Sequence, residues 1–418
     1  MKKSIYNYIK RLNSERTLIF NTKNHALVEL NQDTYDKYDR EDFEDAVAGS
    51  MYELGFLIDD DIDEIQELEK NRENACYYHD ELTITVMVTE KCNFRCPYCY
   101  QDHMPVSLSA EKTQQLLLYL KNVNKTGKKK INISWFGGEP LLNMDPVFTI
   151  ERYLKQEKIE GYSKITTNGY LINEELLDRI KRETRINSFQ ITLDGTQQQH
   201  NETRVHIDGT PTYKIICENI SMTIKKGFFV VIRLNLTKKN CDMRQFFIEL
   251  ENLSLDKSMY AVHVTNANKF EASEDKDNFY FESAEEYAQA YSKVQDIFIE
   301  SNYHFPRNYT KKFGCEFECN NVFLISPKLE LFFCSSCELD CFFKQGYIDA
   351  QGQLILNENY KKRENLSVFY DEECKRCIVL PMCMGGCTYA RIKNKKFCIP
   401  ERYILDSYVL RLYNESKK

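Results

Sequence analysis

Apolar and polar positions follow one regular pattern through the central part of the chain. Short runs rich in β-branched residues, typical of buried strands, are each followed by a longer stretch with apolar residues every three or four positions, typical of amphipathic helices. The predicted strands cover residues 82–89, 131–136, 163–169, 188–195, 229–237 and 259–265. Such alternation favours a parallel sheet with right-handed crossovers. Six units are too few for a standard eight-stranded barrel, so the pattern predicts an α/β fold, either an open, curved partial barrel or a doubly wound sheet.

The two flanking regions differ from this centre. The first 80 residues predict a small α+β module, with strands at 17–20 and 26–30 joined as a hairpin and helices over 39–56 and 61–71. A helix over 283–302 leads into a C-terminal region where periodicity fades and cysteines dominate. We therefore predict three domains, at 1–80, 81–303 and 304–418.

Composition narrows the class of protein. The chain has 418 residues, 42% of them hydrophobic, which is enough for two or three domains with their own cores. No run approaches the ~20 apolar residues of a membrane helix, and no apolar stretch follows the basic start. The net charge is −7 and basic residues are scattered among acidic ones. We expect a cytoplasmic protein with no membrane and no nucleic-acid partner.

The chain has sixteen cysteines, and their tight grouping is the strongest indication of a metal-binding function. The segment "KCNFRCPYCY" places Cys92, Cys96 and Cys99 directly after the first strand of the predicted sheet, where ligand sites of parallel α/β folds gather. Three thiolates on one loop can hold three irons of a [4Fe–4S] cluster and leave the fourth iron open. The alternative is a zinc site completed by Cys76 or His103.

The segment "CNFRCPYC" resembles the signature of radical S-adenosylmethionine (SAM) enzymes. The resemblance implies a partial (β/α)6 barrel in which the open iron binds SAM and an electron from the cluster cleaves it. The resulting 5′-deoxyadenosyl radical would remove hydrogen from a substrate, so the protein's own part is to bind, orient and shield.

Further motifs of this family follow at successive strand ends. They are "GGEP" at 137–140, "TTNG" at 166–169, "TLDG" at 192–195 and "HNETR" at 200–204. The resemblance implies that Arg204 pairs with the SAM carboxylate and that the "GGEP" segment receives the SAM amino group. The SAM-binding residues that it implies are Tyr98, Gly137, Gly138, Glu139, Thr192 and Arg204, with Arg233 and Asn235 as weaker candidates. No catalytic side chain is assigned.

The C-terminal cysteines resemble the SPASM extension, which adds two auxiliary [4Fe–4S] clusters, giving three in all. The implied ligands of the first auxiliary cluster are Cys315, Cys319, Cys334 and Cys387, and those of the second are Cys374, Cys377, Cys383 and Cys398. Leu329 stands where the family usually has glycine, and Cys337 and Cys341 are extra, so the partition between clusters stays open. Zinc ribbons are the alternative for these groups.

Relatives with SPASM domains mature peptides or sulfatases. The resemblance implies an oxidoreductase of the type that matures ribosomally synthesised and post-translationally modified peptides (RiPPs), by thioether, sactipeptide or ranthipeptide chemistry. Its partners would be a precursor peptide with a leader and a reductase, flavodoxin or ferredoxin. Residues 1–80 resemble a winged-helix module that binds leaders at a sheet edge, although they could simply cover the barrel.

Other functions remain open at this point. Sulfatase maturases usually have an Asp where this chain has Ser335, which disfavours formylglycine formation. Carbon–carbon crosslinking or epimerisation of a peptide is a second alternative. A non-catalytic metal-binding scaffold is a third.

Overall fold

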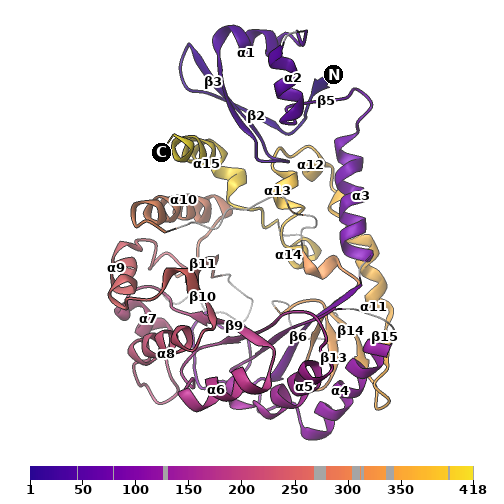
Figure 1. Ribbon diagram of the computed structural model, residues 1–418, viewed down its shortest axis with the longest axis vertical. Coiled ribbons are helices and arrows are strands. Elements are labelled where there is room, and N and C mark those ends of the chain that lie inside the picture. The colour runs from indigo at the N-terminus through magenta and orange to yellow at the C-terminus, as the bar shows by residue number, and fades with distance from the viewer. Residues whose placement is uncertain are drawn as a thin grey trace.

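The computed structural model describes residues 1–44, 46–78, 80–125, 130–267, 279–303, 311, 315–335, 343–393 and 396–417. Its parts stack in three tiers, with the N-terminal module at one end, the C-terminal helices in the middle and the large sheet at the other end (Figure 1). Within the described residues, no helix is both long and apolar enough to cross a membrane.

The large sheet contains the six predicted strands in sequence order, and every pairing between neighbours is parallel. These are β6 (Glu81–Thr89), β7 (Lys130–Gly137), β8 (Ser163–Thr167), β9 (Ile186–Thr192), β10 (Phe229–Leu236) and β11 (Tyr260–Asn266). The helices that connect and follow them are α4 (Ala110–Lys125), α5 (Asp145–Gln156), α6 (Glu174–Glu183), α7 (Gln197–Thr203), α8 (Tyr213–Lys225), α9 (Arg244–Asn252) and α10 (Ala284–Glu300). The predicted α/β fold is confirmed.

This sheet continues beyond β6 with strands from the C-terminal region. Strand β12 (Val322–Ile325) lies parallel to β6, and β13 (Glu330–Phe332), β14 (Lys344–Ile348) and β15 (Leu354–Leu356) follow in antiparallel order. The turn from β12 to β13 contains Leu329 at a φ of 63°, the left-handed region that favours glycine. The turn therefore keeps the glycine-like backbone although the residue is a fully buried leucine.

The N-terminal module is a three-stranded antiparallel sheet of β2 (Asn7–Arg11), β3 (Arg16–Asn21) and β4 (Leu27–Asn31), beside the short pair β1 (Lys2–Lys3) and β5 (Leu57–Ile58). The predicted hairpin at 17–30 is confirmed. The predicted helix over 39–56 is present but shorter: α2 covers only Ala46–Glu53, and a separate helix, α1 (Gln32–Asp39), ends where the predicted one begins. Helix α1 starts where the Asn31 side chain accepts a hydrogen bond from the Thr34 amide, a capping signal that periodicity alone misses.

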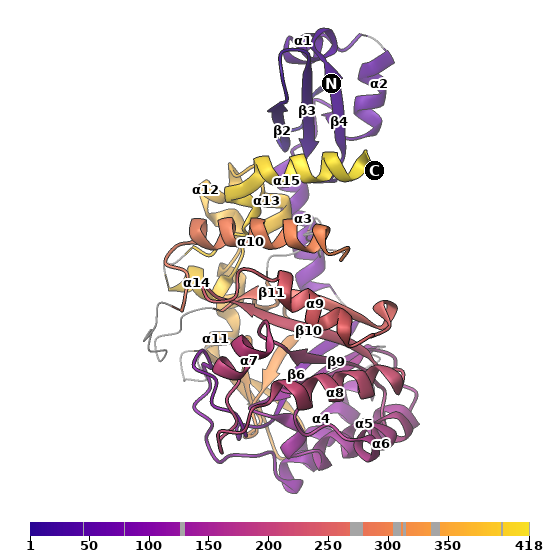
Figure 2. The same cartoon turned by 90° about the vertical axis from the view of Figure 1, so that its left-hand side faces the viewer.

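Two helices join this module to the rest of the molecule (Figures 1 and 2). Helix α3 (Glu64–Tyr77) runs from the module past the C-terminal tier to the start of β6. Helix α15 (Glu401–Ser416) packs under the module sheet, where Tyr408 and Val409 bury Leu18 and Phe20. The remaining C-terminal helices are short: α11 (Glu358–Lys361), α12 (Glu372–Lys375), α13 (Leu380–Cys383) and α14 (Thr388–Ile392).

Candidate functional site

A cavity of about 180 Å³ lies where the loop after β6 meets the carboxyl ends of β7 to β11. Parallel strands bring their carboxyl ends to one edge, so motifs far apart in the sequence converge there. The predicted residues that line this cavity are Cys92, Cys96, Tyr98, Cys99, Gly137, Gly138, Thr192 and Arg204, together with the weaker candidates Arg233 and Asn235.

The three thiols of the loop share this cavity without the geometry of a single-ion site. Burial raises the pKa of Cys92 to about 11 and that of Cys96 to about 12, so a bound cation must replace their protons. In the described part of the chain, no group of three or more His, Cys, Asp or Glu side chains is arranged to hold one metal ion. Of the two residues named for the zinc alternative, Cys76 lies against Cys319, away from this cavity, whereas His103 lines the cavity with its Nε2 3.4 Å from Cys99 Sγ.

Arg204 carries the clearest sign of a missing partner. It caps α7 and is only 8% exposed, and its Nη1 donates to the Tyr98 hydroxyl at 3.1 Å. Its Nε is buried and has no hydrogen-bond partner among the described residues. Burial alone would lower the pKa of Arg204, but Cys96, Tyr98 and Asp194 together raise it well above its usual value. A permanently charged donor facing the cavity fits the carboxylate of SAM.

Asp194 of the "TLDG" segment was not singled out from the sequence, yet it orders this edge of the sheet. It is 1% exposed, and its Oδ1 accepts from the Asn235 backbone amide at 3.0 Å and from Asn235 Nδ2 at 3.1 Å. Its Oδ2 accepts from the Tyr98 hydroxyl. The sequence does place this carboxylate at the end of the predicted strand 188–195, but only Thr192 of the "TLDG" segment was assigned a role.

Glu139 differs from the other predicted SAM residues because its carboxylate is already occupied. Its oxygens accept from Thr167 Oγ1 at 2.6 Å, the Asn168 amide at 2.7 Å and the Leu141 amide at 3.0 Å. The side chain thus ties "GGEP" to "TTNG". The neighbouring glycines serve the same packing, since a Cβ on Gly138 would lie 2.3 Å from the Lys91 carbonyl oxygen. The close approach that they allow is to the cysteine loop.

Two buried asparagines make a second link to this loop. Asn168 Nδ2 donates to Asn93 Oδ1 at 2.7 Å, which joins "TTNG" to the residue after Cys92. Asn93 Nδ2 is buried and has no hydrogen-bond partner among the described residues. The loop is therefore held by backbone and amide contacts on both sides.

The four cysteines assigned to the second auxiliary cluster surround one small cavity. Cys374, Cys377, Cys383 and Cys398 all line it, and its volume is about 20 Å³. Burial raises the pKa of Cys374 to about 11. Arg402 Nη1 donates to Cys398 Sγ at 3.1 Å, which supplies positive charge beside the thiols.

The cysteines assigned to the first auxiliary cluster lie in two places. Cys315 and Cys334 pack against the same apolar cluster, which contains Phe332 and Phe343. Cys387 is near enough to Cys334 for the charge of Cys334 to contribute to its raised pKa, although burial is the main cause. Cys319 instead contacts Cys76, with 3.2 Å between the two Sγ atoms. Cys337 and Cys341 lie outside the described residues.

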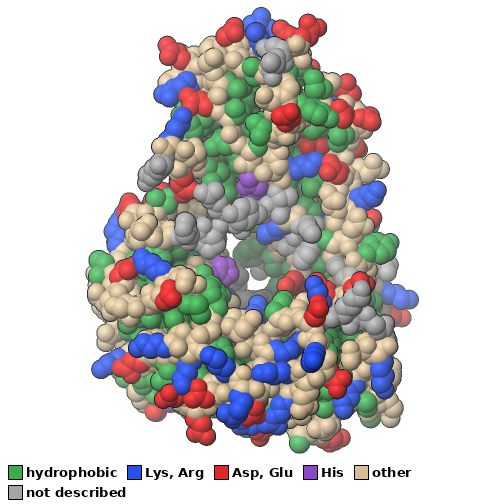
Figure 3. Space-filling view, viewed as in Figure 1, with side chains coloured by type: hydrophobic (Ala, Val, Ile, Leu, Met, Phe, Trp, Pro, Cys, Tyr) green, Lys and Arg blue, Asp and Glu red, His purple; other side chains and the backbone are tan. Residues whose placement is uncertain are grey.

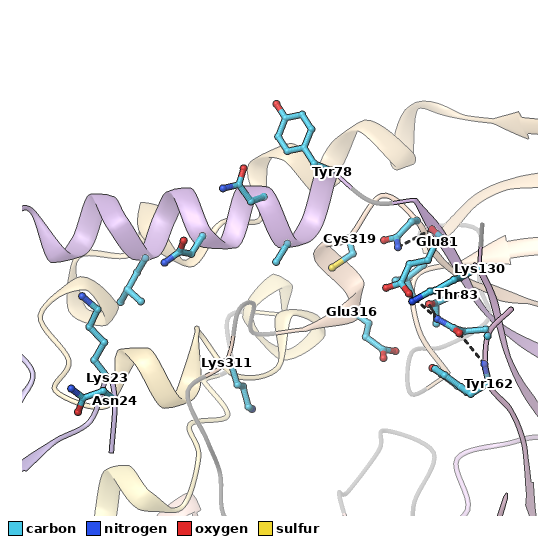
Figure 4. Close-up of a pocket in the computed structure, with 18 of the residues that line it drawn as sticks. Lys23, Asn24, Tyr78, Glu81, Thr83, Lys130, Tyr162, Lys311, Glu316 and Cys319 are labelled. Carbon is cyan, nitrogen blue, oxygen red and sulfur yellow. Dashed lines mark hydrogen bonds between the residues drawn. The ribbon is translucent and has the colours of Figure 1, made fainter. Parts of the chain in front are cut away.

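Volume alone does not identify the chemical site. A cavity of about 1310 Å³ opens beside α3 and at the amino ends of β6 and β7, where Glu81, Thr83 and Lys130 line it (Figure 4). The SAM residues lie at the opposite, carboxyl ends of these strands. The smaller cavity therefore holds the convergent thiols and Arg204, whose Nε has no hydrogen-bond partner among the described residues.

Comparison with known proteins agrees with this geometry. Residues 86–245 match the model of the radical SAM superfamily, so the chain contains a radical SAM domain. The radical SAM cyclopropyl synthase TigE of Paramaledivibacter caminithermalis is 25% identical over 219 residues, 47% of this chain and 45% of that protein. The chain thus spans about half the length of this relative, and it spans 48% of the GTP 3′,8-cyclase of Rhodopirellula baltica, which is 30% identical over 43% of the chain.

Longer matches extend into the C-terminal region. A cysteine-type anaerobic sulfatase-maturating enzyme of Clostridium perfringens is 22% identical over 76% of this chain and 91% of that protein. The fold matches anSMEcpe with bound AdoMet and Cp18Cys peptide at a TM-score of 0.63, with 16% identity over 80% of this chain and 99% of that one. It matches Streptococcus suis SuiB bound to S-adenosylmethionine at a TM-score of 0.57, with 16% identity over 96% and 98% of the two chains. The chain thus contains a radical SAM domain, and its fold is similar to the folds of anSMEcpe and SuiB.

Proposed function

We propose that this chain is a peptide maturase that takes hydrogen from a ribosomally made precursor peptide and joins a cysteine sulfur to the carbon so activated. The observation that carries the proposal is the cavity that three loop thiols share with Arg204, whose buried Nε has no hydrogen-bond partner among the described residues. Cys92, Cys96 and Cys99 would hold a [4Fe–4S] cluster, and the two C-terminal sets would hold two more. When bound, the first cluster and SAM together supply a 5′-deoxyadenosyl radical.

The chain's own residues bind, orient and shield. Arg204 fixes the SAM carboxylate, and Asp194 and Asn235 hold the Tyr98 hydroxyl against Arg204. Phe94, with its ring centroid 5.4 Å from the Arg204 guanidinium carbon, excludes water from this contact. Thr192 and Gly138 complete the polar wall from two further strand ends. Burial of the cavity keeps a reactive species away from solvent.

The N-terminal module offers edges to which a leader peptide could add a strand. Strand β3 is paired on both sides, which leaves β2 and β4 as the edges of the described sheet. Ile9 on β2 is 39% exposed, so an apolar side chain is available beside the edge. Strand addition gives affinity through main-chain hydrogen bonds and specificity through such side chains. The molecule is also hollowed between the sheet tier and the tier above it, which leaves room for a peptide (Figure 3).

Sulfatase maturation is the second candidate, because a curated sulfatase-maturating enzyme that matches 76% of this chain and the anSMEcpe structure both point to it. Two observations favour the peptide maturase. The SuiB fold covers 96% of this chain, against 80% for anSMEcpe. Ser335 stands beside Cys334, and a hydroxyl cannot accept a proton at neutral pH as a carboxylate does.

Anaerobic reconstitution tests the proposal. We expect about twelve irons per chain and SAM cleavage under dithionite. When Cys92, Cys96 and Cys99 are changed together to Ala, cleavage should stop and about eight irons should remain. Co-expression with a cysteine-bearing precursor should yield a peptide lighter by two hydrogens per link. Exchange of cysteine sulfur for oxygen would favour formylglycine formation instead, and bound zinc without SAM cleavage would overturn the enzyme proposal.

The leader-binding role has a separate test. Ile9→Asp on β2 should weaken precursor binding, measured by fluorescence anisotropy of a labelled leader, and leave uncoupled SAM cleavage unchanged. Ile248→Asp on α9 is the matched control, because Ile248 is also exposed, at 54%, and lies on the barrel. Equal leader affinity in the two variants would remove the recognition role from β2.

A further inference from the structure

Three basic side chains lie on the face of the large sheet that also carries the SAM cavity. They are Lys164 on β8, Arg233 on β10 and His263 on β11. Side chains alternate between the two faces of a strand, so Lys164 lies on the same face as Thr166, which lines the cavity. Arg233 lines the cavity itself, and His263 is its partner in the parallel register. The lining of the cavity thus continues along the sheet as a group of basic residues.

The opposite face of the same strands is apolar and fixes the direction of these basic side chains. The neighbouring residues Ile165, Ile232 and Val262 are at most 3% exposed and belong to the main core. A shift by one position would bring the charges into this core, so the alternation holds them on the cavity face. Charged side chains are seldom placed inside a fold unless something pairs with them. The group therefore calls for a partner.

The two permanent cations of this group have only neutral contacts in the described part of the chain. Arg233 Nε donates to Asn235 Oδ1 at 3.0 Å. Lys164 Nζ lies 5.8 Å from the centre of the Tyr162 ring. No described carboxylate forms an ion pair with either cation.

The acidic side chains at this end of the sheet belong to the large cavity. Glu81 and Glu316 line that cavity together with Tyr162 (Figure 4). Glu81 accepts a hydrogen bond from Asn132 Nδ2 at 3.1 Å. Burial raises the pKa of Tyr162, and the charges of Glu316 and Glu81 raise it further, so these carboxylates act on the outer side of the ring that Lys164 approaches.

The three basic groups instead act on one another. Partial burial lowers the pKa of His263, and the charges of Arg233 and Lys164 lower it further. The groups thus lie within electrostatic range of one another, in a place that water screens poorly. Like charges held together there raise the free energy of the empty site, and a bound anion would relieve the repulsion.

The size of this charge indicates the kind of anion. One guanidinium, one ammonium and a neutral imidazole suit a single negative charge, and arginine's planar fork matches a carboxylate. Because Arg233 lines the SAM cavity, a carboxylate held here would lie beside the place where hydrogen is taken. A peptide offers two such groups, an acidic side chain or its C-terminus. Only a side chain can stand next to a modified residue within the peptide.

We propose that Lys164, Arg233 and His263 form a subsite for the side-chain carboxylate of an Asp or Glu that the precursor peptide carries close to the residue that loses hydrogen. This inference rests on the proposed function and names the class of its substrate. The three residues would act as specificity-determining residues that orient the peptide under SAM.

The test uses fluorescein-labelled peptides of sequence Ala-Gly-Cys-Gly-Gly-X-Gly-Ala with an amidated C-terminus, in which X is Asp, Asn or Lys. A fourth peptide has Asn at X and a free C-terminal carboxylate. Binding to the anaerobically reconstituted enzyme with SAM and no reductant is measured by fluorescence anisotropy. We expect the Asp peptide to bind about tenfold more tightly than the Asn peptide, as a charge-assisted contact implies. The free C-terminus should add little.

Variants of Lys164 show whether this preference comes from the proposed subsite. Lys164→Gln should lower the preference for Asp over Asn, and Lys164→Arg should keep it. Lys164→Glu should shift the preference toward the Lys peptide, an outcome that a misfolded variant would not give. Lys214→Gln is the matched control, because Lys214 is exposed on α8, and it should keep the wild-type preference.

Three results would overturn the inference. Equal binding of the Asp, Asn and Lys peptides, or no binding of any, would remove the subsite. Tighter binding of the peptide with the free C-terminus would assign the cations to a peptide terminus. A loss of SAM affinity in Lys164→Gln as large as that in Arg204→Gln would assign them to SAM. In each case SAM cleavage by the wild type would leave the proposed function standing, whereas bound zinc without SAM cleavage would overturn both.

Discussion

The proposed SAM cavity and the proposed first auxiliary site both contain cysteines, but different interactions hold them. The SAM cavity lies at the edge of one parallel sheet, where backbone hydrogen bonds from Gly138 to Thr89 and from Glu139 to Lys91 fix the loop. The auxiliary site brings together α3, the Cys315–Cys319 segment and the start of α14, held by the buried carboxylate of Glu318. A side-chain change should therefore cost ligand affinity in the first site and stability in the second.

The largest effect should follow from Glu318→Gln. This change leaves the guanidinium groups of Arg72 and Arg391 without a buried counter-charge, and breaking such a pair costs about 3–5 kcal/mol. We expect this loss in the free energy of unfolding, measured by denaturant titration, and loss of the first auxiliary cluster's iron. Glu183→Gln, which breaks a more exposed pair with Arg152, should cost far less, because water screens an exposed ion pair. Equal losses in the free energy of unfolding for the two variants would contradict the structural role given to Glu318.

Arg204→Gln should weaken the binding of SAM. It removes a charge-assisted hydrogen bond to SAM, which is worth about 1.5–3 kcal/mol, or roughly 10- to 100-fold in dissociation constant. Anaerobic equilibrium titration with SAM measures this loss, with Arg152→Gln on the outer face of α5 as the control. Unchanged SAM affinity would contradict the role given to the unpartnered Nε.

Gly138→Ala tests whether backbone packing holds the SAM cavity. The added Cβ would lie 2.3 Å from the Lys91 carbonyl oxygen, so the loop must shift, at a cost of about 1–3 kcal/mol in stability. We also expect SAM cleavage to fall. Gly49→Ala on α2 meets no atom within 4 Å and should instead stabilise the protein by about 0.5–1 kcal/mol. If Gly138→Ala changed neither the stability nor SAM cleavage, backbone packing would not be what holds the cavity.

The smallest effect concerns pH. Burial, and then Arg204, hold the pKa of His200 well below its usual 6.5. Near pH 6 the His200 side chain therefore binds a proton in the unfolded chain but not in the folded chain. The free energy of unfolding is thus highest above about pH 6.5 and decreases as the pH falls. His200→Gln should reduce the loss by up to about 1.4 kcal/mol per pH unit in unfolding experiments between about pH 6.5 and 5.5. An unchanged acid slope would contradict the buried, neutral state.

The sheet was predictable because its signals are local. Each strand from β6 to β11 is an apolar run followed by an amphipathic helix, and the motifs of the SAM cavity stand directly after those strands. Strand β2 and helix α1 were not predicted. Helix α1 buries Tyr35 and Tyr38 but carries few other apolar residues, so it shows little periodicity. The hydrogen bonds that occupy the Glu139 carboxylate could not be predicted either, because only the parallel register of the strands brings its partners Thr167 and Asn168 near.

The sequence by itself determined the order of strands and helices, the thiol-bearing loop and the residues at the strand ends, because these depend on neighbours a few positions away. Only the tertiary structure decided which distant groups meet. It placed Cys76 against Cys319, 243 positions along the chain, and directed Arg72 and Arg391 to one carboxylate. Such contacts depend on how α3 docks on the C-terminal region, and side-chain packing between remote segments leaves no periodic signal in the sequence.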